Sequence, residues 1–135
     1  MLTKKILDSE DVNTILFNAS NFAMKNEWPV SIAIVDDAGF LLAFKRLDNA
    51  PLFSVNLAIE KAKSSALSKR DSKALEDLVT SGRTAFIGVG EIICIEGGVL
   101  IRDNSTIVGA IGVSGVSSHN DAAIALHGAE AWQLL

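Results

Sequence analysis

The sequence predicts an α+β domain in which helices pack on a mainly antiparallel sheet. Two pairs of apolar segments are each joined by a short polar turn, which is typical of β-hairpins. Segments with the apolar spacing of amphipathic helices lie before, between and after these pairs. Together these patterns predict a single layered domain over residues 1–135, with five strands in the order α-β-β-α-α-β-β-β-α.

The first helix is expected to begin at Asp8 or Ser9, because either residue offers a side-chain cap. It should end near Asn26, since Trp28 precedes Pro29 and is thereby restricted to an extended conformation. Its apolar positions follow the i, i+3, i+4, i+7 spacing of one helix face: Val12, Ile15, Leu16, Ala19, Phe22 and Ala23.

The first hairpin is predicted from residues 31–35 and 40–44, joined by a turn at 36–39. Both segments are apolar at consecutive positions and not only at alternate ones. A sheet with one face in water would alternate apolar with polar residues. Both strands are therefore expected to be central and covered on both faces.

Two helices are predicted to follow this hairpin. The second helix should start with a side-chain cap at Asp48 and with Pro51 in its first turn. Its buried face is narrow and mostly made of small residues, which predicts close packing on its neighbour. These positions are Leu52, Val55, Ala58, Ile59, Ala62 and Ala66. A short third helix is expected from a cap at Asp71 or Ser72 to Val79.

Seven of the ten glycines lie between Gly88 and Gly115, so close backbone contacts are concentrated in this part of the fold. Residues 91–96 predict a strand, whereas the pattern at 84–90 assigns no element. The second hairpin is expected next, from two apolar runs on either side of a polar turn between residues 97 and 115. A last helix is predicted from about His119 to Leu134.

Length and composition exclude several classes of function. With 49% hydrophobic and 21% charged residues, the chain is globular and not disordered. The net charge of −4, with 12 basic residues scattered among 16 acidic ones, argues against a nucleic-acid partner. No apolar run reaches the roughly 20 residues needed to span a bilayer. The amino terminus lacks the apolar segment of a secretion signal, so the expected compartment is the cytoplasm, and the single Cys94 agrees with it.

The loop at the end of the second hairpin is one candidate binding element. Gly112, Ser114 and Gly115 would let a ligand or a neighbouring subunit approach the backbone closely. Tight packing within the sheet is the alternative interpretation. A dinucleotide site is disfavoured, because the spacing of Gly109, Gly112 and Gly115 is GxxGxxG and no second strand of a βαβ unit follows.

His119 follows this loop at the opening of the last helix and is a candidate ligand for haem iron or another metal. The alternative is an exposed histidine in a capping turn, because no second ligand stands at a recognised spacing. Asp121 lies three residues after Ser118, which matches a capping box. His127 is too far along the helix to share a metal with His119, so packing or an interface is favoured for it.

Arg46 and Lys61 are candidate cations for a carboxylate or a haem propionate. Arg46 lies where the second predicted strand leaves the sheet, and Lys61 lies on the following helix. An ion pair between Arg46 and Asp48, with Lys61 on a solvated helix face, is an equally weighted alternative.

Beyond these individual residues, the chain resembles the GlcG/HbpS-like family over nearly its whole length. The matching segments occur in the family's order: VDDAGFLLAFKRLDNA at 35–50, AIEKA at 58–62, KAL at 73–75, GGV at 97–99 and VGAIGVSG at 108–115, followed by Asp121. The resemblance implies a five-stranded antiparallel sheet with packed helices, and homo-oligomers. It also implies a small-molecule ligand: some members bind haem, whereas others accompany glycolate, diol or glycerol metabolism.

Three functions are therefore expected to compete. The first is an oligomer that holds haem or a related tetrapyrrole between subunits, with His119 on the iron and Arg46 or Lys61 on a propionate. The second is an accessory protein or enzyme that handles a small hydroxy acid or a diol-derived metabolite through the same cations. The third is a structural interaction module without catalysis.

Overall fold

A single antiparallel sheet with strand order β2-β1-β4-β3 organises the computed structural model, which describes residues 1–133. The elements follow the chain in the order α1 (Ser9–Lys25), β1 (Ser31–Asp36), β2 (Leu41–Arg46), α2 (Ser54–Ser68), α3 (Ser72–Thr80), the 3₁₀ helix η1 (Thr84–Gly88), β3 (Gly98–Asp103), β4 (Thr106–Ser114) and α4 (Ser118–Gln133). The predicted α+β class with an antiparallel sheet is confirmed.

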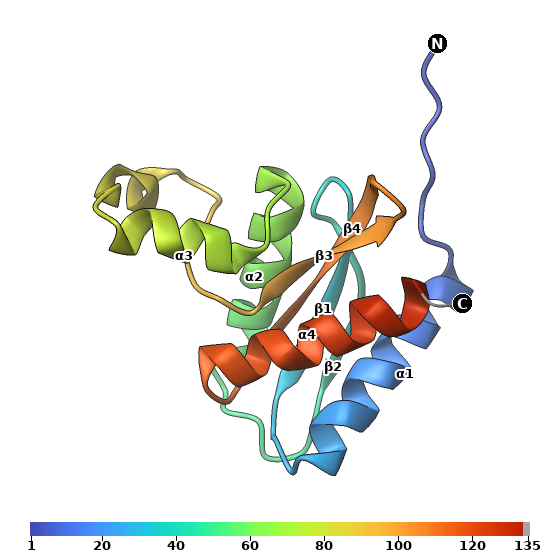
Figure 1. Ribbon diagram of the computed structural model, residues 1–135. Helices are drawn as coiled ribbons and strands as arrows, with labels where there is room; N and C mark the ends of the chain where they lie inside the picture. Colours follow the sequence, from blue (N-terminus) through green and yellow to red (C-terminus); the bar gives the residue numbers. More distant parts are fainter. Residues whose placement is uncertain (134–135) are drawn as a thin grey trace.

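Helices cover both faces of the sheet (Figure 1). On one face α2 packs through small residues, and the buried cluster there consists of Ala33, Val35, Ala58, Ala62, Ala66, Leu100 and Ala110. On the other face α1 and α4 pack on the strands, and the buried cluster there contains larger aliphatic residues from the helices and the strands, among them Ile15, Ile32, Ile111 and Ile124. The small-residue face predicted for the second helix is confirmed at Ala58, Ala62 and Ala66, and it brings α2 close to the strands. The burial predicted for Leu52 is wrong, because Leu52 precedes α2 and is 78% exposed.

The start of α1 was predictable from its local sequence. Asp8 accepts a hydrogen bond from the Asp11 backbone N–H at 2.8 Å, and the Asp11 carboxylate accepts one from the Asp8 N–H at 3.0 Å. This reciprocal capping box satisfies two N–H groups that the helix leaves unpaired. The helix ends at Lys25, close to the predicted end at Asn26.

Both predicted hairpins form, but the burial expected for residues 40–44 is wrong. β2 pairs with β1 alone and is an edge of the sheet. Phe40 is 72% exposed and Leu41 is 49% exposed, so the helices cover this edge only in part. The consecutive apolar residues of β2 therefore mark an exposed apolar edge and not a central strand.

The sheet has four strands, because the strand predicted at residues 91–96 does not form. This segment runs as irregular chain from η1 to β3. Its backbone groups bond to side chains of the helices: the Ile93 N–H donates to Ser64 Oγ at 2.8 Å, and the Glu96 N–H donates to Glu76 Oε1 at 3.4 Å. Side-chain acceptors on α2 and α3 thus replace the neighbouring strand that a β ladder would need.

Two predicted helix starts also differ from the structure. α2 begins at Ser54 without a side-chain cap, three residues after Pro51, so a capping role for Asp48 is wrong. Asp71 does precede α3, but its carboxylate accepts a hydrogen bond from the Leu100 N–H at 2.9 Å. Asp71 therefore ties α3 to β3. The predicted end of the last helix, at Leu134, lies outside the described residues.

Within residues 1–133, no helix combines the length and the apolar character needed to cross a membrane.

Candidate functional site

A buried ion pair joins the two helix layers at one end of the sheet. Lys61 of α2 is 1% exposed and Asp121 of α4 is 2% exposed. The Lys61 ammonium lies 3.1 Å from Asp121 Oδ2 and donates to the Val113 carbonyl at 3.0 Å. The other carboxylate oxygen of Asp121 accepts the Val116 N–H at 3.0 Å. Each charge is thus satisfied inside the protein, as a buried charge must be.

The Gly97-Gly98 pair makes room for this arrangement. A Cβ on Gly97 would come within 2.7 Å of Lys61 Nζ, and φ is +136° there, a conformation that favours glycine. A Cβ on Gly98 would overlap the Lys61 backbone and the Ser65 hydroxyl. The chain entering β3 therefore runs directly over Lys61.

Burial raises the pKa of Asp121 above the ordinary value of an aspartate. The Val116 N–H and the Lys61 ammonium act in the opposite direction, because both favour the ionised carboxylate. Desolvation is the largest of these effects, so the folded protein holds the proton of Asp121 more tightly than the unfolded chain does.

The solvated helix face considered for Lys61 is therefore wrong, because the side chain is buried, and so is the capping box expected from Ser118 to Asp121. The capping bond at the start of α4 comes from the preceding residue, since Ser117 Oγ accepts the Asn120 N–H at 3.2 Å. A signal for the buried pair was present in the sequence. Lys61 falls between Ala58 and Ser65 on the small-residue stripe of α2, where an unpaired charge would be costly.

His119 lines a largely apolar depression of about 320 Å³, which we call the His119 cavity. One wall comes from the start of β3, with Gly98 and Val99. The other wall comes from the first half of α4, with His119, Ala122, Ala123 and Leu126. Asp71, Lys73 and Glu96 stand at the remaining positions and supply the charges. His119 is exposed, so its imidazole is accessible to a ligand.

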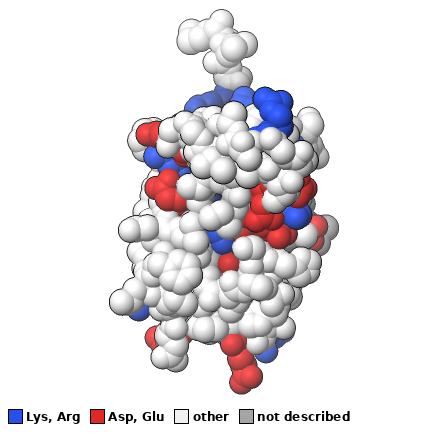
Figure 2. All heavy atoms as spheres, turned by 90° about the vertical axis from the view of Figure 1, so that its left-hand side faces the viewer, with Lys and Arg blue, Asp and Glu red and all other residues white. Residues whose placement is uncertain are grey.

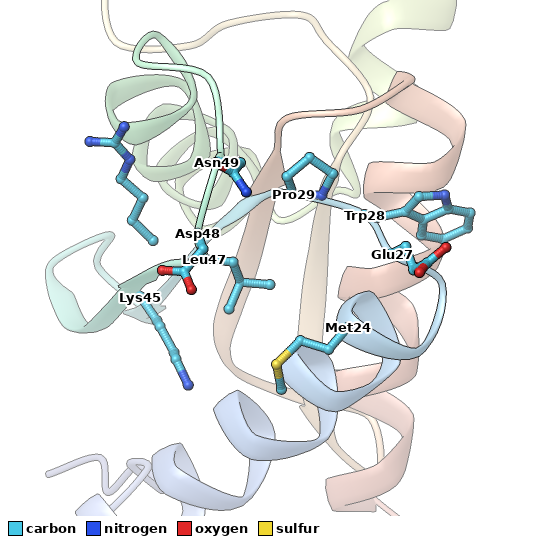
Figure 3. Close-up of a pocket in the computed structure, with 9 residues that line it drawn as sticks. Met24, Glu27, Trp28, Pro29, Lys45, Leu47, Asp48 and Asn49 are labelled. Carbon is cyan, nitrogen blue, oxygen red and sulfur yellow. The ribbon is translucent and has the colours of Figure 1, made fainter.

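Arg46 lines a different depression of about 490 Å³, which we call the Arg46 cavity (Figure 3). Its lining combines the end of α1 with the exit of β2: Met24, Glu27, Trp28, Pro29, Lys45, Arg46, Leu47, Asp48 and Asn49. In Figure 3 the Met24 and Leu47 side chains face each other, whereas Lys45 runs toward α1. Successive residues of a strand point to opposite faces, so Lys45 and Arg46 do not converge on one anion.

The polar contact of Arg46 is to the backbone, because its Nη2 donates to the Ala50 carbonyl at 3.2 Å. Among residues 1–133, no ion pair between Arg46 and Asp48 forms. The structure thus places Arg46 and His119 in separate cavities of one subunit.

The glycine loop makes its close contacts inside the subunit. A Cβ on Gly112 would overlap the backbone of Ala58 and Ala62 in α2. A Cβ on Gly115, where φ is +149°, would overlap Pro29 and Val30. Ser114 is buried at the end of β4 and pairs in register with Ser31. The neighbours that these glycines approach are therefore helix α2 and the segment directly before β1.

His127 stacks on Phe22 of α1, with ring centroids 4.4 Å apart, which confirms its expected packing role. Within the described residues, no group of three or more His, Cys, Asp and Glu side chains is arranged to hold a metal ion. On the face shown in Figure 2, acidic and basic residues are interspersed among uncharged surface.

Comparisons with known proteins point to one family. The family model described as "Haem degrading protein HbpS-like" matches residues 7–130. Protein GlcG of Escherichia coli K12 is 40% identical over 114 residues, which cover 84% of this chain and 85% of that protein.

Solved structures agree with this match. A PduOC:heme complex superposes with a TM-score of 0.85 at 26% identity and covers 94% of this chain and 95% of that one. A double mutant of HbpS from Streptomyces reticuli gives a TM-score of 0.88 at 25% identity, covering 96% and 89% of the two chains.

Proposed function

The chain belongs to the HbpS-like family, and from this premise we propose that it is a homo-oligomer that binds haem, or a related tetrapyrrole, at the His119 cavity. The observation that carries the proposal is an accessible imidazole on an otherwise apolar wall. Neutral histidine is a common axial ligand of haem iron, and an apolar wall suits the porphyrin face.

The chemistry of the cavity fits haem better than a bare metal ion. A bare ion takes several protein ligands, and the residues around His119 do not supply them. Haem brings its own equatorial nitrogens and needs one axial side chain from the protein. Ala122 and Ala123 have small side chains beside His119 in the cavity lining. Lys73, which lines the same cavity and pairs with Asp77 at 3.0 Å, would exchange this exposed ion pair for a propionate.

The relatives support the same ligand. The matching family model is described as a haem-degrading protein, and one structural neighbour was solved as a complex with haem. Bound haem would supply a redox-active iron, which the side chains of this chain do not provide by themselves. Arg46 lines a separate cavity, so it would not contact a propionate of haem bound at the His119 cavity of the same subunit.

Replacing His119 with Ala is expected to shift or abolish the Soret band of the ferric haem complex, because the axial imidazole is lost. We expect wild-type affinity in the micromolar range, on the order of −8 kcal/mol. His127→Ala is the matched control, since His127 lies on the same helix but stacks on Phe22 outside the cavity. It should leave the Soret band unchanged.

Superimposable spectra of wild type and His119→Ala would exclude His119 as the ligand. If wild type shows no Soret band, while a small hydroxy acid raises its melting temperature, haem binding is excluded and the result supports a function in handling a small metabolite. If neither compound binds, the result supports a structural interaction module without catalysis.

The proposed oligomer uses the exposed edge of β2. This edge leaves backbone N–H and C=O groups without a strand partner, next to the exposed side chains of Phe40, Leu41 and Leu42. When the β2 edges of two copies pair antiparallel about a two-fold axis, the backbone groups of each edge gain partners and the exposed apolar side chains become covered.

Charge complementarity supports this pairing. In an antiparallel arrangement, the Lys45 and Arg46 end of one β2 strand lies beside the beginning of the other β2 strand. The other end of the hairpin carries Asp36, the last residue of β1, and Asp37, the first residue of the turn, which also pairs with Lys4 of the same subunit. Each subunit thus brings a basic strand end toward the acidic turn of its partner, which favours this register.

Leu42→Lys is expected to reduce the particle from a multiple of the subunit mass to 14.3 kDa, because a charge on an exposed edge opposes edge-to-edge pairing. Light scattering measures the mass. Phe17→Lys is the control, since Phe17 is an exposed apolar residue that belongs to helix α1 and not to the strand β2. A wild-type mass of 14.3 kDa, or a Leu42→Lys oligomer of wild-type size, would contradict the proposed interface.

A further inference from the structure

The two walls of the His119 cavity come from elements that lie on different layers of the fold. The β3 wall belongs to the sheet, and the α4 wall belongs to the helix layer opposite α2 (Figure 1). A ligand held between these walls depends on their relative position. The contacts that fix each wall therefore bear on binding, even where they do not touch the ligand.

The β3 wall is seated on α2. Gly98 lies against the Lys61 backbone and the Ser65 hydroxyl. The Gly98 N–H also donates to Ser72 Oγ at 2.7 Å, which ties the same residue to the start of α3. The start of β3 is thus held by packing on Lys61 and by the hydrogen bond to Ser72.

The α4 wall is held by Asp121, which lies two residues after His119 and one before Ala122. Its carboxylate bonds to Lys61 and to the Val116 N–H, and so fixes both the first turn of α4 and the loop that enters it. Both walls therefore depend on Lys61, which also donates to the Val113 carbonyl at the end of β4.

We infer that Lys61 and Asp121 are positioning residues for the ligand of the His119 cavity. This inference rests on the proposed function. The pair holds the β3 wall and the α4 wall at a fixed separation. Hydrogen bonds from residues that do not touch the metal orient a ligating histidine in the same way. It acts through the backbone of the walls, because both side chains are buried away from the cavity lining.

The test compares two double variants. Lys61→Met with Asp121→Asn removes the charges, fills the space of the lysine stem and keeps an acceptor for the Val116 N–H. Lys63→Met with Glu91→Gln is the matched control: Lys63 lies on the same helix, and its ion pair with Glu91 at 3.2 Å is open to solvent on the Glu91 side, with Lys63 partly exposed. Ferric haem is titrated into each variant, and thermal unfolding is followed in parallel.

We expect the Lys61/Asp121 double variant to unfold cooperatively and to bind haem roughly 10- to 100-fold more weakly than wild type, the loss usual for outer contacts of a ligating side chain. Its Soret band should shift, as fewer molecules carry an axial imidazole. The control pair should match wild type in both measurements. A folded Lys61/Asp121 double variant with unchanged Kd and unchanged Soret band would overturn the inference.

A second readout needs no haem. In the ligand-free double variant, amide chemical shifts should change at Val99, Ala123 and Leu126, wall residues that do not adjoin a substituted residue in the sequence. Gly98 and Ala122 are not counted, because Gly98 touches Lys61 and Ala122 directly follows Asp121. Changes confined to Val113 and Val116 would show a local structural role and would contradict the inference. If wild type does not bind haem, the proposed function fails, and these amide shifts still decide the positioning role. If the double variant does not fold, Asp121→Asn alone is measured in the same way.

Discussion

Gly112→Val is expected to destabilise the subunit by about 3 kcal/mol or more, at or beyond the upper end of the usual cost of overpacking. Gly112 of β4 pairs in register with Gly98 of β3, and α2 rests on both glycines. A valine side chain at Gly112 would overlap the backbone of Ala58 and Ala62. Backbone cannot rotate away as a flexible side chain can, so the helix must move off the sheet.

Urea unfolding measures this effect through the midpoint of the transition. Gly88→Val is the control, because a Cβ at Gly88 meets no atom within 4 Å. The control should stay within about 1 kcal/mol of wild type, as surface substitutions usually do. A Gly112→Val midpoint equal to that of the control would show that α2 does not lie as close to β4 as described.

Lys61→Met is expected to cost about 3–5 kcal/mol of folding stability, because it leaves the buried Asp121 carboxylate without its counter-charge. Asp121 is 2% exposed, so water cannot replace the ammonium. Adding Asp121→Asn should recover much of the loss, since the pair is then removed as a whole.

Lys63→Met provides the matched control for this prediction. Lys63 is on the same helix, and in its ion pair Glu91 is exposed and Lys63 is partly exposed. Removing an exposed pair typically costs less than about 1 kcal/mol. Equal losses for Lys61→Met and Lys63→Met in urea unfolding would contradict the buried position of the Lys61 and Asp121 pair.

Features that depend on neighbouring residues in the chain were predictable from the sequence. The capping box at Asp8 and the two hairpins rest on residues that lie close together, and the small-residue face of α2 follows from helix spacing. The resemblance to the GlcG/HbpS-like family is likewise confirmed by the family match over residues 7–130.

Features that depend on tertiary partners were not predictable in the same way. Residues 91–96 have the composition of a strand, but Ser64 and Glu76 satisfy their N–H groups. β2 has the composition of a central strand, but nothing in its own sequence says that it lies at an edge. A lysine is expected at the surface, and the partner that allows Lys61 to be buried, Asp121, lies 60 positions later in the sequence.

The candidate site was predicted in part for the same reason. The glycine and serine loop before the last helix predicts His119 as a candidate ligand, and in the structure His119 lines an apolar cavity. The cations grouped with it in the sequence do not join it, since Arg46 lines another cavity and Lys61 is buried. Lys73, which does line the His119 cavity, carries no local signal of its role.

Paramagnetic broadening of amide signals by ferric haem tests the proposed binding of haem at the His119 cavity most directly. Iron held near His119 should broaden the amides of Gly98, Val99, Ala122 and Ala123, while those around Leu47 stay sharp. The His119→Ala variant should lose this selective broadening. Broadening centred on the Arg46 cavity, or none at saturating haem, would contradict the account.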